Sequence, residues 1–436
     1  MFKKLLILSS VFILSGCHTH LNKMTLLREP VKNTERYNYL DEDYLSFKDK
    51  LRGFSSRLSD SFVKREFKEN SNITLSPLSI ELCLGLAIRS ASNNTREELL
   101  KAFDIDYDSF NQFYKMYFNQ MSREIYSQDK LVSELLLTNS IWIDNDITLL
   151  DSGLDALRDD YYCYSYHADF NKDNRNSNKA IQEFIKDKTK GLINPKLKLS
   201  ELTLLVLMNT LYLKDLWNDY GDNLQYVSKD IEFTNRDKSV SKKQLLDGYH
   251  FLGKTITTDD YSSFFTETDH GYRLYFVKPN EGKDLKDIFN KDTLNYVLDK
   301  NNLIIKDDIK REIYHTECYF PEFKAECDLD LKDMLIEDFD VKDLFDIDKC
   351  DFTNLVNGDI AIYCQEVRHI AKLDVNKKGI EGAAITMMAM GGAAAPDEIP
   401  YTDVYETFIV DKEFGYILTN SDNDVIFSGT VTNIDY

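Results

Sequence analysis

The sequence predicts an α+β protein built around one large core. Helix-like segments dominate the early part of the chain and short strand-like runs dominate its last third, the segregated order that is typical of this class. Of the 436 residues, 43% are hydrophobic and 12% are aromatic, so global disorder is excluded. The 7 prolines and 17 glycines are too few to form long linkers between domains.

The first segment has the features of an export signal. A positive pair, Lys3-Lys4, precedes the apolar run Leu5 to Leu14, which is too short to span a bilayer. The run continues into Leu14-Ser15-Gly16-Cys17, which resembles a bacterial lipobox, where the peptide is removed and the cysteine receives lipid. We therefore expect a signal peptide over 1–17 and a lipid anchor at Cys17. The alternative is an ordinary secretory signal with a chance cysteine.

This interpretation predicts a protein of the bacterial cell envelope, held on a membrane by lipid and open to exposure at the cell surface. The next stretch, residues 18–52, is polar and has few aliphatic side chains. We expect it to be a flexible tether between the membrane and a single domain over residues 53–436.

Local patterns then predict the elements of that domain in order. A helix-like stretch surrounds Phe62, and Ser76-Pro77 opens a helix running from Ile80 to Ala87 that is apolar on most faces and therefore buried. Leu135 to Ile143 has the composition of a strand.

Later segments continue the pattern. Asn178 to Lys190 is helical and ends at Gly191 in a C-cap role. The apolar stretch from Leu202 to Leu213 predicts a central strand that is buried on both faces. Short strands and turns follow and end with Asp424 to Val431.

Charge and motif content exclude several function classes. The formal charge is −21, and it becomes −23 once Lys3 and Lys4 are removed, so we expect a soluble chain that repels nucleic acid. None of the cysteines after Cys17 forms a CxxC pair, so no metal site is expected, although some could pair as disulfides. No HExxH, GxSxG or P-loop occurs, which predicts a protein that is not an enzyme and needs no cofactor.

Five segments, in this order and at nearly the right spacing, resemble motifs of the serpin family. They are Asn72 to Ile80 (NITLSPLSI), Thr189 to Ile193 (TKGLI), Asn209 to Trp217 (NTLYLKDLW), His369 to Asn376 (HIAKLDVN) and Phe408 to Phe414 (FIVDKEF). Each motif alone is weak, whereas the ordered set, spanning residue 53 to the end, is specific. Two departures are Leu75 in place of phenylalanine and Glu413 in place of proline.

The resemblance implies three β-sheets, about nine helices and a central sheet that can admit one more strand. It also implies a polar shutter beneath two strands of that sheet, consisting of Ser76, Ser79, Asn209 and His369. Trp217 would lie at the breach, where a loop first enters. Without the other motifs, the favoured interpretation of His369 is a half-buried strand histidine, and the alternative for Trp217 is a core tryptophan.

An exposed reactive-centre loop is implied for residues 377–400. Its hinge would comprise Gly379, Ile380, Glu381, Gly382, Ala383, Ala384, Ile385 and Thr386. In an extended strand one face would carry Ile380, Gly382, Ala384, Thr386, Met388 and Met390, which are all uncharged and so suited to burial between strands. The alternatives are a flexible Ala/Gly linker and an ordinary core strand.

Three features of this loop depart from the family pattern. Ile380 replaces the usual threonine, and Lys377-Lys378 stand where acidic residues are usual, so a salt bridge at the base of the loop would be absent. Extra length lies after Pro396, in Tyr401 to Thr407. Counting from Gly379 places the scissile bond at Ala393-Ala394, within two or three residues.

The predicted function is suicide-substrate inhibition of serine-type endopeptidases with small-residue preference, either elastase-like or subtilisin-like. The partner would be the protease, held as a covalent acyl complex by a monomeric inhibitor. The alternative is a non-inhibitory serpin-fold surface protein that binds or acts as a scaffold. A surface hydrolase is disfavoured because the sequence has no nucleophile constellation.

Overall fold

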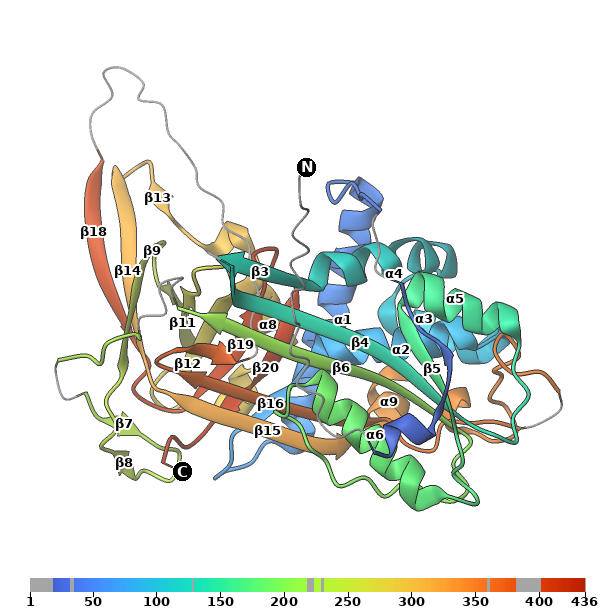
Figure 1. Ribbon diagram of the computed structural model, residues 1–436. Helices are drawn as coiled ribbons and strands as arrows, with labels where there is room; N and C mark the ends of the chain where they lie inside the picture. The colour runs from blue at the N-terminus through green and yellow to red at the C-terminus, as the bar shows by residue number, and fades with distance from the viewer. Residues whose placement is uncertain are drawn as a thin grey trace, which may run out of the picture.

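The computed structural model of the chain describes residues 19–31, 35–127, 129–217, 223–228, 231–358, 361–381 and 401–435. These ranges contain nine α-helices, three short 3-10 helices and twenty strands in three large sheets and one small hairpin (Figure 1). The predicted α+β class and the three sheets are confirmed.

Most of the α-helices lie in the first half of the chain. They are η1 (Leu21–Lys23), α1 (Glu42–Glu66), α2 (Pro77–Ser90), α3 (Asn93–Phe103), α4 (Tyr107–Met121), α5 (Asp151–Tyr161), α6 (Asn174–Lys188), α7 (Leu285–Ile288), α8 (Lys291–Leu298), η2 (Lys300–Asn302), α9 (Lys332–Phe339) and η3 (Asp343–Phe345). No helix within the described ranges is both long enough and apolar enough to cross a bilayer.

Sheet A is the largest sheet and has eight strands. Seven follow the order β1 (Thr25–Arg28), β5 (Cys163–Ala168), β4 (Lys130–Asp144), β6 (Leu205–Leu216), β17 (Gly379–Glu381), β16 (Arg368–Asn376) and β15 (Phe323–Asp330), and β3 (Arg123–Ser127) pairs with β4. β17 separates β6 from β16 at one end of the sheet only, because it is three residues long.

Two further sheets and a hairpin complete the fold. Sheet B contains β10 (Ile256–Thr257), β11 (Tyr261–Glu267), β12 (Arg273–Pro279), β19 (Phe414–Thr419), β20 (Val425–Val431) and β2 (Ile73–Leu75). Sheet C contains β13 (Lys306–Asp307), β14 (Glu312–Phe320), β18 (Thr402–Ile409) and β9 (Leu246–Leu252), and β7 (Phe233–Thr234) pairs with β8 (Val240–Ser241).

The core lies between sheets A and B and the helices beside them. α2 is buried along nearly its whole length and contacts both β6 and β20, as its all-round apolar sequence predicts. Ser76 caps it by accepting a 3.3 Å hydrogen bond from the Ser79 N–H, as expected from Ser76-Pro77. α6 lies across the other face of sheet A, where Phe184 packs edge-on against Trp142.

The structure differs from the predicted tether. Residues 25–28 form β1, which extends sheet A by pairing with β5, and α1 begins at Glu42, well before residue 53. The polar composition of this segment suggested a tether, but polar contacts are what hold it against the domain. The Glu183 carboxylate on α6 accepts hydrogen bonds from the backbone N–H groups of His20 and Leu21, both at 2.9 Å. Arg28 donates to Asp151 and Asp155 on α5 at 2.6 and 2.8 Å.

Candidate functional site: the gap in the central sheet

Below β17, strands β6 and β16 face one another across an open gap. β17 pairs with β6 only at Gly379–Leu216 and Ile380–Asp215, and with β16 only from Asn376 to Asp374. In the part of the chain that the structure describes, no strand pairs with the rest of these two facing edges. Unpaired strand edges offer free backbone donors and acceptors, so the gap is built to receive a strand.

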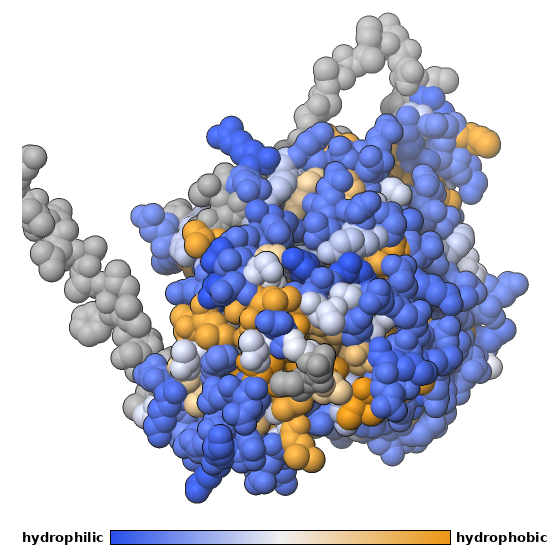
Figure 2. All heavy atoms as spheres, turned by 90° about the vertical axis from the view of Figure 1, so that its right-hand side faces the viewer, coloured by the Kyte–Doolittle hydropathy of each residue, from blue (hydrophilic) through white to orange (hydrophobic). Residues whose placement is uncertain are grey.

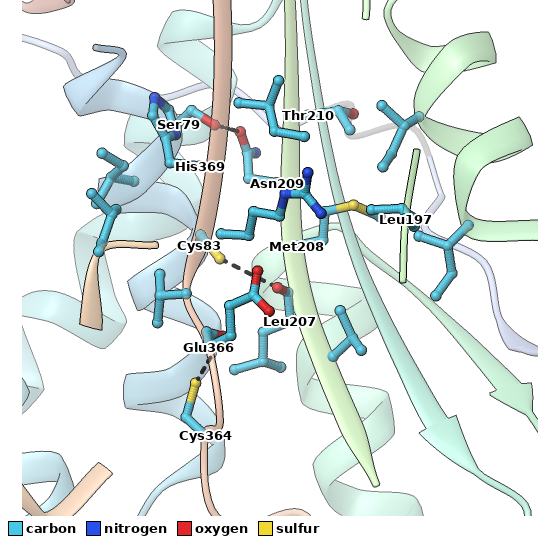
Figure 3. A pocket seen from close by; sticks show the side chains of 18 of the residues that line it. Ser79, Cys83, Leu197, Leu207, Met208, Asn209, Thr210, Cys364, Glu366 and His369 are labelled. Carbon is cyan, nitrogen blue, oxygen red and sulfur yellow. Dashed lines mark hydrogen bonds between the residues drawn. The ribbon is translucent and has the colours of Figure 1, made fainter. Parts of the chain in front are cut away.

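A cavity of about 320 Å³ occupies the gap (Figure 3). Its walls come from β6, β16, α2, α6 and the segment after α6, and they are mostly apolar, including Leu84, Ile185, Leu197, Leu207 and Ile370. Figure 2 looks at the end of the sheet where β6 and β16 begin and shows hydrophobic side chains gathered there among hydrophilic ones. An apolar, partly open slot of this kind suits small uncharged side chains.

All four predicted shutter residues take part in hydrogen bonds that link the start of α2 to both strands. The Ser79 hydroxyl donates to Asn209 Oδ1 on β6 at 2.7 Å, and the Ser76 N–H donates to His369 Nε2 on β16 at 3.1 Å. Ser76 itself is joined to Ser79 through the helix cap. The structure therefore brings together all four residues inferred from the motifs, and Figure 3 shows three of them, Ser79, Asn209 and His369, beside the cavity.

His369 is neutral in this arrangement. Burial lowers its pKa to about 4, and Nε2 accepts a hydrogen bond, so the ring proton is on Nδ1. A protonated ring would place a donor against the Ser76 N–H and leave a charge in the apolar slot. The shutter thus requires the uncharged imidazole.

The network continues through residues that the motifs did not indicate. Asn209 Nδ2 donates to Asn139 Oδ1 on β4 at 2.9 Å, and Asn139 Nδ2 donates to the Tyr114 hydroxyl at 2.9 Å and to the Tyr161 carbonyl at 2.7 Å. Asn139 is completely buried. A lone asparagine within the apolar run from Leu135 to Ile143 was the signal that could have identified it, since buried polar groups are paired.

The breach lies at the end of the gap where β17 enters between β6 and β16. Trp217 is buried, and its Nε1–H donates to the Asn376 carbonyl at 2.7 Å, which joins the end of β6 to the end of β16. Beside it, the His270 ring nitrogen Nδ1 lies 2.6 Å from Asp215 Oδ1, and burial raises the pKa of this carboxyl. The sequence motifs indicated Trp217 but not the His270–Asp215 pair.

The start of the hinge already occupies the top of the gap. Gly379 lies so close to β6 that an added Cβ would collide with the Asp215 carbonyl oxygen, so only glycine fits. Ile380 faces inward and is 1% exposed, whereas Glu381 faces the other side and accepts a 3.0 Å hydrogen bond from the Tyr212 hydroxyl. Isoleucine in place of threonine is therefore accommodated as a core side chain.

The rest of the hinge (Gly382, Ala383, Ala384, Ile385, Thr386) and the bond Ala393-Ala394 lie outside the described residues, as does Cys17. The base of the loop is held by backbone contacts: the Lys377 N–H donates to Glu322 Oε1 and its carbonyl accepts from the Leu224 N–H, both at 2.8 Å. The expected extra length after Pro396 is accounted for, because Tyr401 to Thr407 leads into and forms most of β18.

The described residues contain no cluster of histidine, cysteine and carboxylate side chains suited to a metal ion. All six cysteines after Cys17 have free thiols. Cys83 lines the cavity, where its thiol lies 3.6 Å from the Leu207 carbonyl, and burial raises its pKa to about 12. It packs as a small apolar side chain.

The central sheet thus has a strand-sized gap, the polar shutter beneath it, and β17 between the two facing strands at one end. The family model for serpins, serine protease inhibitors, matches residues 49–434. The chain belongs to the serpin family.

Known proteins are similar over most of the chain. Human antithrombin-III is 24% identical over 390 residues, covering 87% of this chain and 81% of its own length. An uncharacterized serpin-like protein of Methanosarcina acetivorans is 23% identical and covers all of this chain and 97% of its own. The crystal structure of the thermophilic serpin tengpin in the native state superposes with a TM-score of 0.72 at 22% identity, covering 94% of this chain and all of tengpin.

Proposed function

We propose that this serpin is a suicide-substrate inhibitor of serine-type endopeptidases with small-residue preference, elastase-like or subtilisin-like. The protease serine attacks the carbonyl of Ala393, the bond to Ala394 breaks, and the enzyme remains esterified at Ala393. The released loop then enters the gap and carries the acylated enzyme with it before water can hydrolyse the ester.

The observation that carries this proposal is the register of β17. Gly379 is opposite Leu216 and Ile380 is opposite Asp215, so continuing the strand places Thr386 opposite Asn209 on β6. On the other side Glu381 is opposite Asp374, which by the same rule places Thr386 opposite His369 on β16. The uncharged face of the hinge would thus reach the shutter with a hydroxyl between an amide and an imidazole.

Insertion must also be strongly favourable once the loop is cut. A strand from Gly382 to Met390 would add about ten backbone hydrogen bonds, each contributing about 0.5–1.5 kcal/mol net. This sum is comparable with the total stability of a domain, about 5–15 kcal/mol. The uninserted form is therefore held kinetically, as trapping requires.

The test replaces Thr386 with arginine. A guanidinium at the shutter has no partner, so insertion should slow while cleavage continues. Incubated with pancreatic elastase or subtilisin, wild type should form a complex that survives a denaturing gel, and Thr386→Arg should only be cut. The matched control is Glu381→Arg, which places the same group on the outward face and should still trap. If wild type is cut by both enzymes without a complex, the non-inhibitory surface protein becomes the better assignment.

We also propose that Cys17 is lipidated and anchors the protein to the bacterial cell envelope, on the basis of Leu14-Ser15-Gly16-Cys17. Cys17→Ala should move the protein from the membrane fraction to the soluble fraction. Sedimentation of the variant with membranes would contradict the lipid anchor and leave the inhibitor proposal unaffected.

A further inference from the structure

The segment that contains α6 concentrates positive charge in an acidic protein. Residues 172–198 include eight lysines or arginines and three acidic residues, a net charge of +5, whereas the whole chain carries −21. Lys186, Lys196 and Lys198 are exposed. Lys179 is half-buried. Local charge here is therefore opposite in sign to that of the rest of the molecule.

Two of these four lysines lie on the side of α6 that faces the N-terminal segment. Lys179 is four positions before Glu183 and Lys186 is three positions after it, so the three side chains share one side of the helix. Glu183 is the residue that holds η1, through hydrogen bonds of 2.9 Å from the backbone N–H groups of His20 and Leu21. Figure 1 shows η1 against this helix.

The segment after α6 brings the other two lysines to the same place. It runs back along the helix, because Gln182 Nε2 donates to Asn194 Oδ1 at 2.9 Å and the Leu199 N–H donates to Asn178 Oδ1 at 2.7 Å. Both lysines of this segment lie between these two contacts, where they are exposed. The four lysines thus lie on or directly beside one helix.

The charge of these four lysines is not used within the fold. Lys190 pairs with Glu134, and the Lys188 ammonium lies 3.6 Å from the Asp187 carboxylate. Among the described residues, none of the four lysines forms an ion pair with a carboxylate. Their charge is therefore available to an anionic partner outside the protein.

The course of the chain indicates which partner lies next to this surface. The first described residue, Thr19, is two positions after Cys17, and Lys23 in η1 is exposed. A lipid on Cys17, or the apolar run from Leu5 to Leu14 where it is retained, brings this surface directly to a bilayer.

The total charge of the chain does not prevent contact with anionic lipid. Charges on the surface are screened beyond about 8 Å at physiological ionic strength, so the local charge decides the interaction. Lysines next to a bilayer are attracted by anionic headgroups. Leu202, which is 76% exposed in the turn before β6, adds an apolar side chain suited to the headgroup region.

We propose that the surface formed by Lys23, Lys179, Lys186, Lys196 and Lys198, with Leu202 at its edge, docks on the anionic phospholipid headgroups of the membrane that carries the protein. This inference rests on the proposed membrane anchor and deepens it, because it adds a contact made by the folded domain itself.

The test measures how fast each lysine reacts with a water-soluble amine reagent, read by peptide mass spectrometry. The full chain is reconstituted into vesicles of phosphatidylcholine alone and of phosphatidylcholine mixed with phosphatidylglycerol. On the anionic vesicles we expect the lysines of the surface to react about threefold more slowly or less, and added salt should restore their rate. Lys310, in the turn between β13 and β14, is exposed and should react equally on both vesicles.

Two triple variants of equal charge change sharpen the test. Lys186→Gln, Lys196→Gln and Lys198→Gln together should remove the protection of Lys179 on anionic vesicles. Replacing three exposed lysines of other elements by glutamine should leave the protection of Lys179 unchanged; these are Lys286, Lys291 and Lys310.

Flotation of the same vesicles separates this inference from the anchor. If the protein floats with both kinds of vesicle and the lysines of the surface react equally on both, the docking surface is overturned and the anchor stands. Flotation with anionic vesicles alone would support the surface and contradict the anchor, and flotation with neither would overturn both. Protection by soluble dextran sulfate but not by anionic vesicles would assign the surface to a dissolved polyanion and overturn the proposal.

Discussion

Sheet A has two places where a strand can be added, the outer edge of β5 and the gap between β6 and β16, and the two differ in how far they are paired. At its outer edge, β1 pairs with β5 and closes the sheet. In its interior, β17 enters between β6 and β16 but pairs with β6 at only two positions. Open edges recruit foreign strands, so β1 covers the edge of β5, whereas the gap between β6 and β16 remains available for the insertion proposed above.

The two places are also held by different chemistry. β1 and η1 are secured by carboxylates on two helices, Glu183 on α6 and Asp151 and Asp155 on α5. The gap is held by a neutral network of hydroxyl, amide and imidazole groups beneath it, including Asn209 and His369. The contacts at the edge involve partly exposed charged side chains, whereas the network beneath the gap is buried and neutral.

The largest expected effect is at the entrance of the gap. Gly379→Ala should displace the hinge from β6, because the new Cβ meets the Asp215 carbonyl oxygen. Cleavage of the loop should raise the unfolding midpoint of wild type by about 20 °C, through the added strand, and that of the variant by less than half as much. Thermal unfolding before and after nicking measures this. Gly53→Ala, where the structure leaves open space around the added Cβ, is the control. An equal rise in all three proteins would contradict the role of Gly379.

The next largest effect is expected in the shutter network beneath the gap. Asn209→Ala removes the acceptor of the Ser79 hydroxyl and the donor to Asn139, and leaves both buried groups short of a partner. We expect a loss of about 2–4 kcal/mol in the free energy of unfolding and a shorter lifetime of the uninserted form. Urea denaturation gives the first quantity. Asn194→Ala at an exposed position serves as control, and a loss below 1 kcal/mol at Asn209 would show that the network is not structural.

A smaller effect is expected at the outer edge. Glu183→Ala removes the acceptor for the backbone N–H groups of His20 and Leu21 and should cost about 1–3 kcal/mol locally. Hydrogen exchange should accelerate at the amides of β1 while trapping persists. Glu201→Ala, an exposed acid in the segment after α6, is the control. Unchanged protection of β1 would mean that strand pairing alone holds it.

The smallest effect is a pH dependence. The pKa of His369 is lowered to about 4 from its ordinary value near 6.5, so the unfolded chain binds a proton at lower cost than the folded one. Stability from this group is present above about pH 6.5 and is lost as pH falls toward 4. Between pH 7.5 and 5.5 we expect a loss of ~1 kcal/mol. His369→Gln should flatten this part of the curve relative to wild type, and an unchanged curve would contradict the assignment to His369.

Part of this organisation was predictable from sequence. Ser76, Ser79, Asn209, His369 and Trp217 could be assigned because their neighbours form recognisable local motifs. β1 could not be predicted in this way, because what holds it comes from residues more than 120 positions away, such as Asp155 for Arg28. Composition alone made that segment look like a tether.

Ile380 in the hinge is a second position whose role became clear only from its surroundings in the fold. Ile380 was a doubtful substitution when compared with a family pattern, yet its position beside Val375 in the core makes an apolar side chain suitable. Asn139 and Tyr114, which extend the shutter network, belong to no family motif, and the pairing of β4 with β6 is what places Asn139 opposite Asn209.

The docking of η1 on α6 also affects how a lipid-anchored copy of the protein would be oriented relative to the membrane. His20, which is bound to Glu183, is only three positions after Cys17, so a lipid at Cys17 would keep this part of α6 within about 10 Å of the membrane surface. Figure 1 places α6 and β18 at opposite corners of the molecule. An anchored copy would stand with sheet C pointing away from the bilayer, presenting its bait to enzymes that arrive from the surrounding medium.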